Sequence, residues 1–291
     1  MDKSRLVREL GYGPTSGRVG WMSKVLAFIR RDRKIWWTYK MWVTLDILET
    51  FSFVITYALV AKIISAERLV ESGYTVGGYL AFSVIGVAFQ QYVFSSVLGI
   101  SEAIRDEQWF GTMETILSSP TSFKIFLFGE ATFRFLISTV FLVCALSLGM
   151  ALGATFTTSP PIVLSVILLS ALMVFSHLTV GIASAGVIMK IKPGNPVAWA
   201  FSWLTQLVSG VFYPLGVLPG YLRWIGKAFP LTYSLDGVRL CLMGGKTIAD
   251  PQVMVNVVWL LVFVAVSLPI SLLIFRLGYN SSRRDGSLAQ Y

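Results

Sequence analysis

The stretch RDEQWFGTMETILSSPT, residues 105–121, is a short polar interruption between two long apolar segments. Gly111 can end the helix before it, and Thr112 is a favourable N-cap for a new helix. The new helix has room for only about two turns, because Ser119-Pro120 is typical of an N-cap followed by a first helical residue. The stretch therefore predicts a short helix across the end of a membrane bundle, with an ordinary hydrophilic loop as the alternative.

The composition of the whole chain agrees with a membrane location. Of its 291 residues 55% are hydrophobic and 13% are charged, whereas a soluble domain is about 25% charged. The chain is therefore an integral membrane protein without room for a soluble catalytic domain of about 100 residues. Its two cysteines, Cys144 and Cys241, give neither a disulfide framework nor metal-site spacing, so we expect no metal.

Six stretches are long and apolar enough to cross a bilayer, which takes about 20 residues. They are residues 41–64, 78–100, 125–152, 161–189, 197–213 and 255–277, of which the fifth is the shortest. Before them, residues 21–40 repeat apolar side chains near helical spacing, with Lys and Arg on another side. This pattern predicts a helix lying in the headgroup layer, although a solvated basic face is the alternative. We predict an all-α integral membrane protein with six transmembrane helices.

The distribution of basic residues predicts the orientation. Seventeen Lys and Arg residues fall on the side of the amino-terminal arm and five on the opposite side, so both termini are expected in the cytoplasm. Residues 105–121 then also face the cytoplasm. Because the net charge of +9 is concentrated along one membrane face, we expect lipids rather than nucleic acid as its partner, in the plasma membrane.

Residues 214–256, between the fifth and sixth crossings, are too apolar for a plain loop. Residues 221–229 and 232–243 predict two short helices, the second ended by Gly244-Gly245. Helices of this length cannot span, so we expect both to be re-entrant and to lie in the outer leaflet, covered by protein or lining a cavity.

Two regions resemble the permeases of ABC-2 type transporters. One is Gly111-Thr112-Met113-Glu114 with ILSSP at 116–120; the other combines GVFYPL at 210–215, Leu218-Pro219 and FPLTY at 229–233. The resemblance implies a coupling helix that docks on an ATP-hydrolysing subunit, an amino-terminal elbow helix and an element that closes the pathway on the outer side. The implied coupling residues are Glu107, Gly111, Thr112, Met113, Glu114, Thr115, Ile116, Leu117 and Ser118. The implied outer gate comprises Phe212, Pro214, Pro219, Pro230 and Tyr233.

The resemblance implies one ABC-2 transmembrane domain over residues 1–291. Residues 1–40 would be the cytoplasmic arm and elbow helix, 41–277 the six-helix bundle and 278–291 a cytoplasmic tail. Gly245-Lys246-Thr247 is not a P-loop, because Leu240 stands where a P-loop needs glycine. We therefore expect no catalytic residues or cofactor on this chain, with ATP and Mg²⁺ bound by a partner. Paired cassettes need two coupling helices, so we expect two permease copies, as a homodimer, and two ATPase subunits.

The first crossing carries two carboxylates. Asp46, Glu49, Phe53 and Tyr57 share one helical face, and a charge in a crossing is by default a functional candidate. Arg134 and Glu130 lie at similar depth in the third crossing. We hypothesise that Arg134 neutralises Asp46 or Glu49, with Glu130 competing; a purely structural ion cluster is the alternative.

A second stripe, on the fifth crossing, comprises Trp199, Trp203, Gln206 and Tyr213. Aromatic stripes with few polar groups suit an amphiphilic cargo, and the resemblance places the first and fifth crossings at a dimer axis; plain packing is the alternative. We expect a permease that exports an amphiphilic drug or lipid. The alternatives are a lipid-linked polysaccharide exporter or, from another class, a membrane-embedded enzyme or passive channel.

Overall fold

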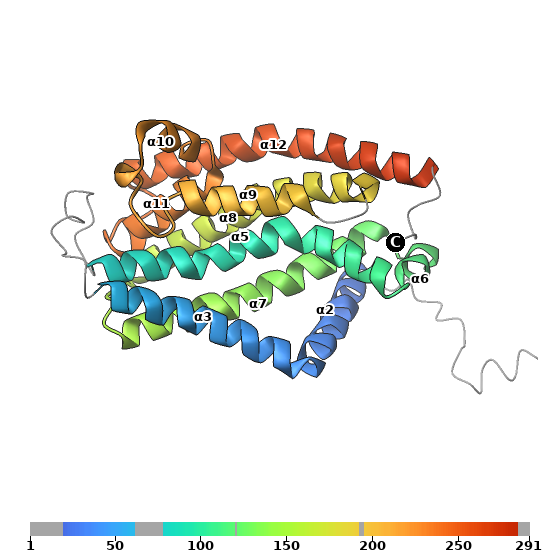
Figure 1. Ribbon diagram of the computed structural model, residues 1–291, viewed down its shortest axis with the longest axis horizontal. Helices are drawn as coiled ribbons and strands as arrows, with labels where there is room; N and C mark the ends of the chain where they lie inside the picture. The colour runs from blue at the N-terminus through green and yellow to red at the C-terminus, as the bar shows by residue number, and fades with distance from the viewer. Residues whose placement is uncertain (1–19, 62–77, 120, 192–194, 285–291) are drawn as a thin grey trace, which may run out of the picture.

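The computed structural model describes residues 20–61, 78–119, 121–191 and 195–284, and in these ranges every regular element is helical. The elements are α2 (Trp21–Thr38), α3 (Lys40–Ala61), α5 (Gly78–Trp109), α6 (Met113–Ser118), α7 (Phe123–Ala151), α8 (Pro160–Ile191), α9 (Pro196–Val208), the 3-10 turn η1 (Leu215–Val217), α10 (Gly220–Gly226), α11 (Pro230–Leu242) and α12 (Pro251–Arg284). Figure 1 shows the long helices running side by side, with α10 and α11 at one end of the bundle and α2 and α6 at the other.

Helix α5 forms the centre of the bundle. It contacts α3, α7, α8, α9 and α11, and Phe82, Ile85 and Phe89 are fully buried. A helix that is apolar on all sides belongs in an interior. By contrast, Val54 is the one residue in the described part of α3 that is buried, so this helix packs on α5 and α7 through one half-buried face and exposes the rest.

Helices α8 and α12 pack through glycines. A Cβ atom added to Gly278 would lie 1.9 Å from the carbonyl oxygen of Gly186. Small residues let membrane helices approach this closely, and the gain is van der Waals contact.

Five helices of the described ranges are long and apolar enough to cross a membrane, namely α3, α5, α7, α8 and α12. They correspond to five of the six predicted crossings. The remaining one, α9, has 13 residues, or about 20 Å of helix, against about 30 Å of hydrocarbon. The apolar run of residues 197–213 is longer than the helix, because the chain turns at Gly210, whose φ is 76°.

Several predicted boundaries differ from the structure. Ser119-Pro120 does not begin the next helix: Ser119 ends α6, and α7 begins at Phe123 with Ser122 as N-cap. Helix α5 continues past Ile100 to Trp109. The two helices predicted at 221–229 and 232–243 are present as α10 and α11. The arm before residue 20, the end of the first crossing at Ile64 and residues 285–291 lie outside the described ranges.

Helix α11 is covered on several sides. It contacts α5, α8 and α12, and Leu231, Leu235 and Val238 are almost fully buried. Its backbone is thus enclosed by protein at the end of the bundle away from α6 (Figure 1).

Candidate functional site

The polar interruption folds as a tight turn followed by α6. Gly111 has a φ of 68°, a left-handed conformation that favours glycine. The backbone N–H of Thr112 donates to the carbonyl of Glu107 across 2.9 Å. Thr112 is the N-cap residue as predicted, but its side chain makes no capping bond. Its hydroxyl donates instead to the carboxylate of Glu107, so Thr112 ties α6 to the end of α5.

One residue anchors α6 in the bundle. Met113 is 4% exposed and joins an apolar cluster with Ile100, Ile104, Ala185 and Met189. This cluster combines α5, α6 and α8, and Phe275 and Tyr279 of α12 pack against it. Phe123 and Leu127 of α7 pack against the same cluster, so Met113 fixes α6 against the ends of four long helices.

The opposite side of α6 faces outward. Glu114, Thr115 and Ser118 are exposed, and just before α6 the rings of Trp109 and Phe110 are 68% and 66% exposed. Ile116 is half-buried, and the side chain of Leu117 lies outside the described part. A short helix anchored on one side and polar on the other has the form of a docking element.

Arg31 on α2 joins this element to the bundle. Its guanidinium pairs with Asp32 across 2.8 Å, with Glu107 across 2.7 Å and with Glu130 of α7. It also lies over the rings of Phe28 and Phe126, at 5.2 and 5.9 Å from their centroids. We call Arg31, Asp32, Glu107 and Glu130 the Arg31 cluster.

The charge of Arg31 is strongly supported. Burial opposes its charge, but the hydrogen bond to Asp32 and the charges of Asp32, Glu107 and Glu130 outweigh this and raise its pKa above the usual range. The sequence pattern predicts Arg31 only as part of a basic helix face, and it predicts no role for Asp32. The available signal was that Asp32 is the single acidic residue among the basic residues of 21–40.

The predicted pairing of Arg134 is wrong. Its guanidinium lies 3.3 Å from Glu102 and 3.6 Å from Asp106, both on α5, instead of pairing with Asp46 or Glu49. Glu130 does not compete for it, because Glu130 pairs with Arg31. Asp46, Glu130 and Arg134 nevertheless line one cavity, whereas Glu49 lies on the exposed face of α3.

Only part of the predicted aromatic stripe lies on the helix α9. Trp199 and Trp203 are 46% and 65% exposed, and Gln206 is half-buried. Tyr213 lies beyond the end of α9, where its hydroxyl donates to the carbonyl of Leu207 across 2.5 Å. On α3, Phe53 is 40% exposed.

At the other end of the bundle, Phe212 contacts two helices, α3 and α5. Its ring stacks on Tyr57 of α3, with centroids 5.1 Å apart, and its carbonyl accepts from the Tyr79 hydroxyl of α5 across 3.0 Å. The other predicted gate residues lie nearby in the chain: Pro214 and Pro219 precede η1 and α10, and Pro230 begins α11. The hydroxyl of the fifth, Tyr233, donates to the Lys227 carbonyl across 2.9 Å.

A buried arginine fixes the turn after α9. Arg239 is 3% exposed and donates to the carbonyls of Gly210, Val211 and Phe82 at 2.7, 2.9 and 3.0 Å. The distribution of basic residues places Arg239 only among those on the outer side. Its position within the apolar stretch of 232–243 was the available signal, because a charge there requires partners.

The comparisons with known proteins identify the family. A family model described as ABC-2 type transporter matches residues 23–243, from the beginning of α2 past the end of α11. A search of curated proteins found no match to the chain. The matched region contains both segments whose motifs carry the resemblance, and it spans most of the chain, which therefore belongs to the ABC-2 type transporter family as a multi-pass membrane permease subunit of an ABC transporter.

Proposed function

We propose that this permease exports an amphiphilic drug or lipid, powered by a separate cytoplasmic ATPase subunit that binds ATP and Mg²⁺ and docks on α6. The observation that carries the proposal is the build of α6. Met113 fixes it in the bundle, while Glu114, Thr115 and Ser118 face outward. The ATPase supplies the energy, and this chain supplies the path.

The Arg31 cluster spreads the motion of α6. Glu107 is bonded both to Thr112 and to Arg31, and Arg31 pairs in turn with Glu130 on α7. A push on α6 thus reaches α5 and α7 through direct packing, and it reaches α2 through the charge pair of Glu107 with Arg31. ATP binding shifts the permease between inward and outward access only as far as it favours one of these two states.

The working unit in this proposal contains two permeases and two ATPase subunits. Helix α3 buries little of its surface, and α9 exposes Trp199 and Trp203. A homodimer that faces these helices toward each other would cover both aromatic surfaces. The resemblance implies that the first and fifth crossings line the substrate pathway. In such a dimer the exposed Glu49 and Phe53 of α3 and the stripe of α9 would lie near the axis between the copies.

We further propose six crossings, with α9 and the turn to Tyr213 as the fifth. In this topology α2 is an elbow helix in the inner headgroup layer, where its Arg and Lys side chains meet anionic lipid. Helices α10 and α11 are re-entrant in this topology; the enclosure of α11 meets the requirement for backbone at membrane depth, and the exposed α10 lies at its outer edge. Both termini are then cytoplasmic, in the plasma membrane, and residues 1–291 form one domain.

Reconstitution with the ATPase subunit tests the proposal. Glu114→Ala and Gly111→Ala should abolish ATP-driven transport of a fluorescent amphiphile while the permease remains folded. Gly220→Ala is the matched control, because a Cβ there meets open space at the opposite end of the bundle. Unchanged transport in both α6 variants would contradict the proposal. Transport of a lipid-linked glycan in place of the amphiphile would favour the polysaccharide alternative.

A further inference from the structure

Residues of α2, α3, α5 and α7 line an open cavity of about 810 Å³. This volume is within the size range of small-molecule sites. Its lining includes six carboxylates and two guanidiniums. The carboxylates belong to Asp32, Asp46, Glu102, Asp106, Glu107 and Glu130, and the guanidiniums to Arg31 and Arg134. The chain has 15 acidic residues and a net charge of +9, so this one cavity concentrates negative charge in a basic protein.

Internal pairing does not balance this charge. Arg31 is shared by three carboxylates and Arg134 by two. The side chain of Asp32 is only 8% exposed, and it shares Arg31 with the neighbouring Glu130. In the described part of the chain, no ion pair includes Asp46, although it lines the same cavity. A carboxylate in a crossing without a cationic partner is costly, and a bound cation beside Asp46 would relieve that cost.

The walls suit an organic cation rather than a metal ion. The rings of Trp36, Tyr39, Trp42, Phe133 and Phe141 line the same cavity as the carboxylates. Aromatic faces attract ammonium groups through cation–π interactions. A bare divalent ion gains little from such rings and prefers a compact set of oxygen ligands.

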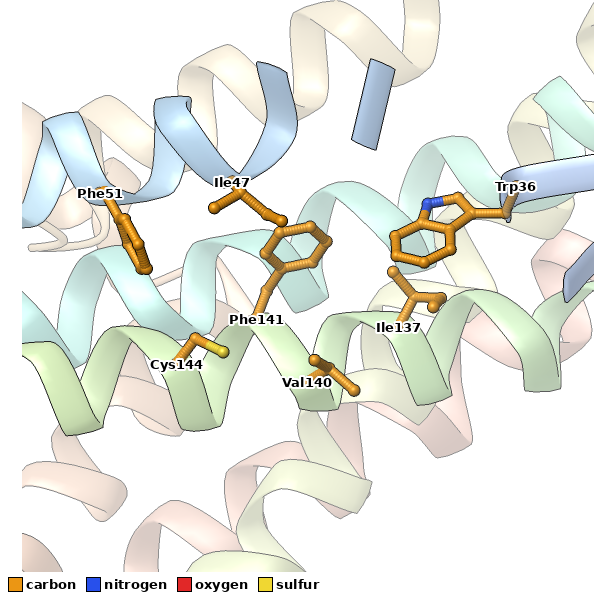
Figure 2. Close-up of a pocket in the computed structure, with 7 residues that line it drawn as sticks. All are labelled: Trp36, Ile47, Phe51, Ile137, Val140, Phe141 and Cys144. Carbon is orange, nitrogen blue, oxygen red and sulfur yellow. The ribbon is translucent and has the colours of Figure 1, made fainter. Parts of the chain in front are cut away.

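An apolar cavity continues from the charged one. Figure 2 shows it between α3 and α7, lined by apolar side chains and the thiol of Cys144. It has about 180 Å³ and shares Trp36, Ile137 and Phe141 with the charged cavity. Apolar cavities of about 150 Å³ bind a benzene ring, so this one has room for a ring or a short alkyl segment.

The two cavities follow each other along the bundle. On α3 the charged cavity includes Val43 and Asp46, and the apolar one includes Ile47 and Phe51. The charged cavity therefore lies at the end of α3 next to α2, and the apolar cavity lies further along α3. A molecule with a cationic head and an apolar tail would fit this sequence of environments.

We propose that these joined cavities form a binding site for a cationic amphiphile. Its ammonium group lies beside Asp32 and Asp46, and its tail lies against Cys144 and Val140. The site is lateral, because it lies between α2, α3, α5 and α7 rather than on the exposed α9 stripe. Transport of the bound molecule rests on the proposed function. Binding itself requires neither ATP nor a partner.

Equilibrium binding tests the charged part. Radiolabelled dodecyltrimethylammonium is titrated onto the permease in phosphatidylcholine nanodiscs, with empty discs subtracted. We expect saturable binding that weakens at least tenfold in Asp32→Asn and in Asp46→Asn. Asp250→Asn is the matched control, since it removes a carboxylate outside the cavity, just before α12. Equal weakening by Asp250→Asn would assign the effect to general charge and overturn the site. Unchanged binding in both Asn variants would also overturn it.

Cysteine labelling tests the tail. Cys144 is exposed and Cys241 is buried, so N-ethylmaleimide should modify mainly Cys144, with Cys144→Ala as the blank. Saturating dodecyltrimethylammonium should slow this labelling several-fold, whereas dodecyl sulfate at the same concentration should not. Equal protection by both detergents would show a nonspecific apolar effect and overturn the assignment.

Two further arms separate the source of the ligand and the two proposals. Displacement of the probe by phosphatidylethanolamine in the discs would show that the natural ligand is a lipid headgroup. If phosphatidylethanolamine does not displace the probe, the natural ligand is a free cationic amphiphile. Saturable binding without ATP-driven transport would contradict the proposed function and leave the site intact. Transport without saturable binding would contradict the binding site and leave the proposed function intact.

Discussion

The Nη1 atom of Arg31 lies 2.7 Å from the Oε1 atom of Glu107. This contact joins the amino-terminal helix α2 to the last turns of α5, immediately before α6. Glu107 also accepts a hydrogen bond from Thr112. A single carboxylate therefore connects the helix that precedes the first crossing with the helix proposed to receive the ATPase.

Replacement of Arg31 should loosen this connection. Arg31→Ala leaves Asp32, Glu107 and Glu130 without their shared cation. We expect a loss of about 1–3 kcal/mol in unfolding free energy, because the carboxylates stay largely buried while the arginine is partly exposed. Thermal unfolding in detergent measures the loss, and ATPase stimulation should fall with it.

A conservative variant and a control variant test whether the Arg31 cluster causes the loss of stability. Arg31→Lys should recover part of the stability, since a lysine keeps the charge but lacks the planar fork that reaches several carboxylates at once. Arg33→Ala removes an exposed arginine of the same helix, and should change stability by no more than about 0.5 kcal/mol. If Arg33→Ala matched Arg31→Ala, the Arg31 cluster would not be the cause.

Met113 and Glu114 should separate anchoring from docking. Met113→Ala removes a buried side chain and should lower stability by about 2–5 kcal/mol. Glu114→Ala changes an exposed residue and should leave stability within about 0.5 kcal/mol, yet it should weaken binding of the ATPase subunit. Thermal unfolding and co-purification measure the two effects. A Glu114→Ala variant that unfolded early but still bound the subunit would contradict this division.

The sequence predicted α6 and the long crossings because both follow from local chemistry. A glycine such as Gly111 can adopt the left-handed conformation that ends a helix. An apolar run of about 20 residues predicts a helix that crosses the membrane. The end of the fifth crossing does not follow from the sequence, because apolar residues continue through the turn at Gly210. The length of an apolar run therefore overestimated the length of the helix.

Contacts between helices were harder to predict. Helical periodicity showed that Glu130 and Arg134 share a face of α7, but it carries no information on which neighbour that face meets. Arg134 in fact meets Glu102 and Asp106, four residues apart on α5. The choice depends on the packing of whole helices, which a single sequence does not reveal.

The close approach of α8 and α12 should be sensitive to one methyl group. Gly278→Ala would place a Cβ atom 1.9 Å from the Gly186 carbonyl oxygen, so the helices must separate. We expect a loss of about 1–3 kcal/mol, greater than the gain of about 0.5–1 kcal/mol from helix propensity. Gly220→Ala has no such neighbour and serves as the control. Equal thermal unfolding of both variants would refute the close contact.

The turn after α9 should depend on the forked head of Arg239. Arg239→Met leaves the carbonyls of Gly210, Val211 and Phe82 without their donor, and we expect a loss of about 3–5 kcal/mol, because each buried acceptor left unsatisfied costs about 1–3 kcal/mol. Arg239→Lys should lose less, because the charge remains while the fork is gone. Arg223→Met is the matched control: Arg223 also donates to two carbonyls, Gly216 and Leu218, but it is exposed, so water can replace it. Hydrogen exchange of the amides at 209–213 should accelerate in Arg239→Met alone, and equal acceleration in Arg223→Met would show that burial of the arginine is not what holds the turn.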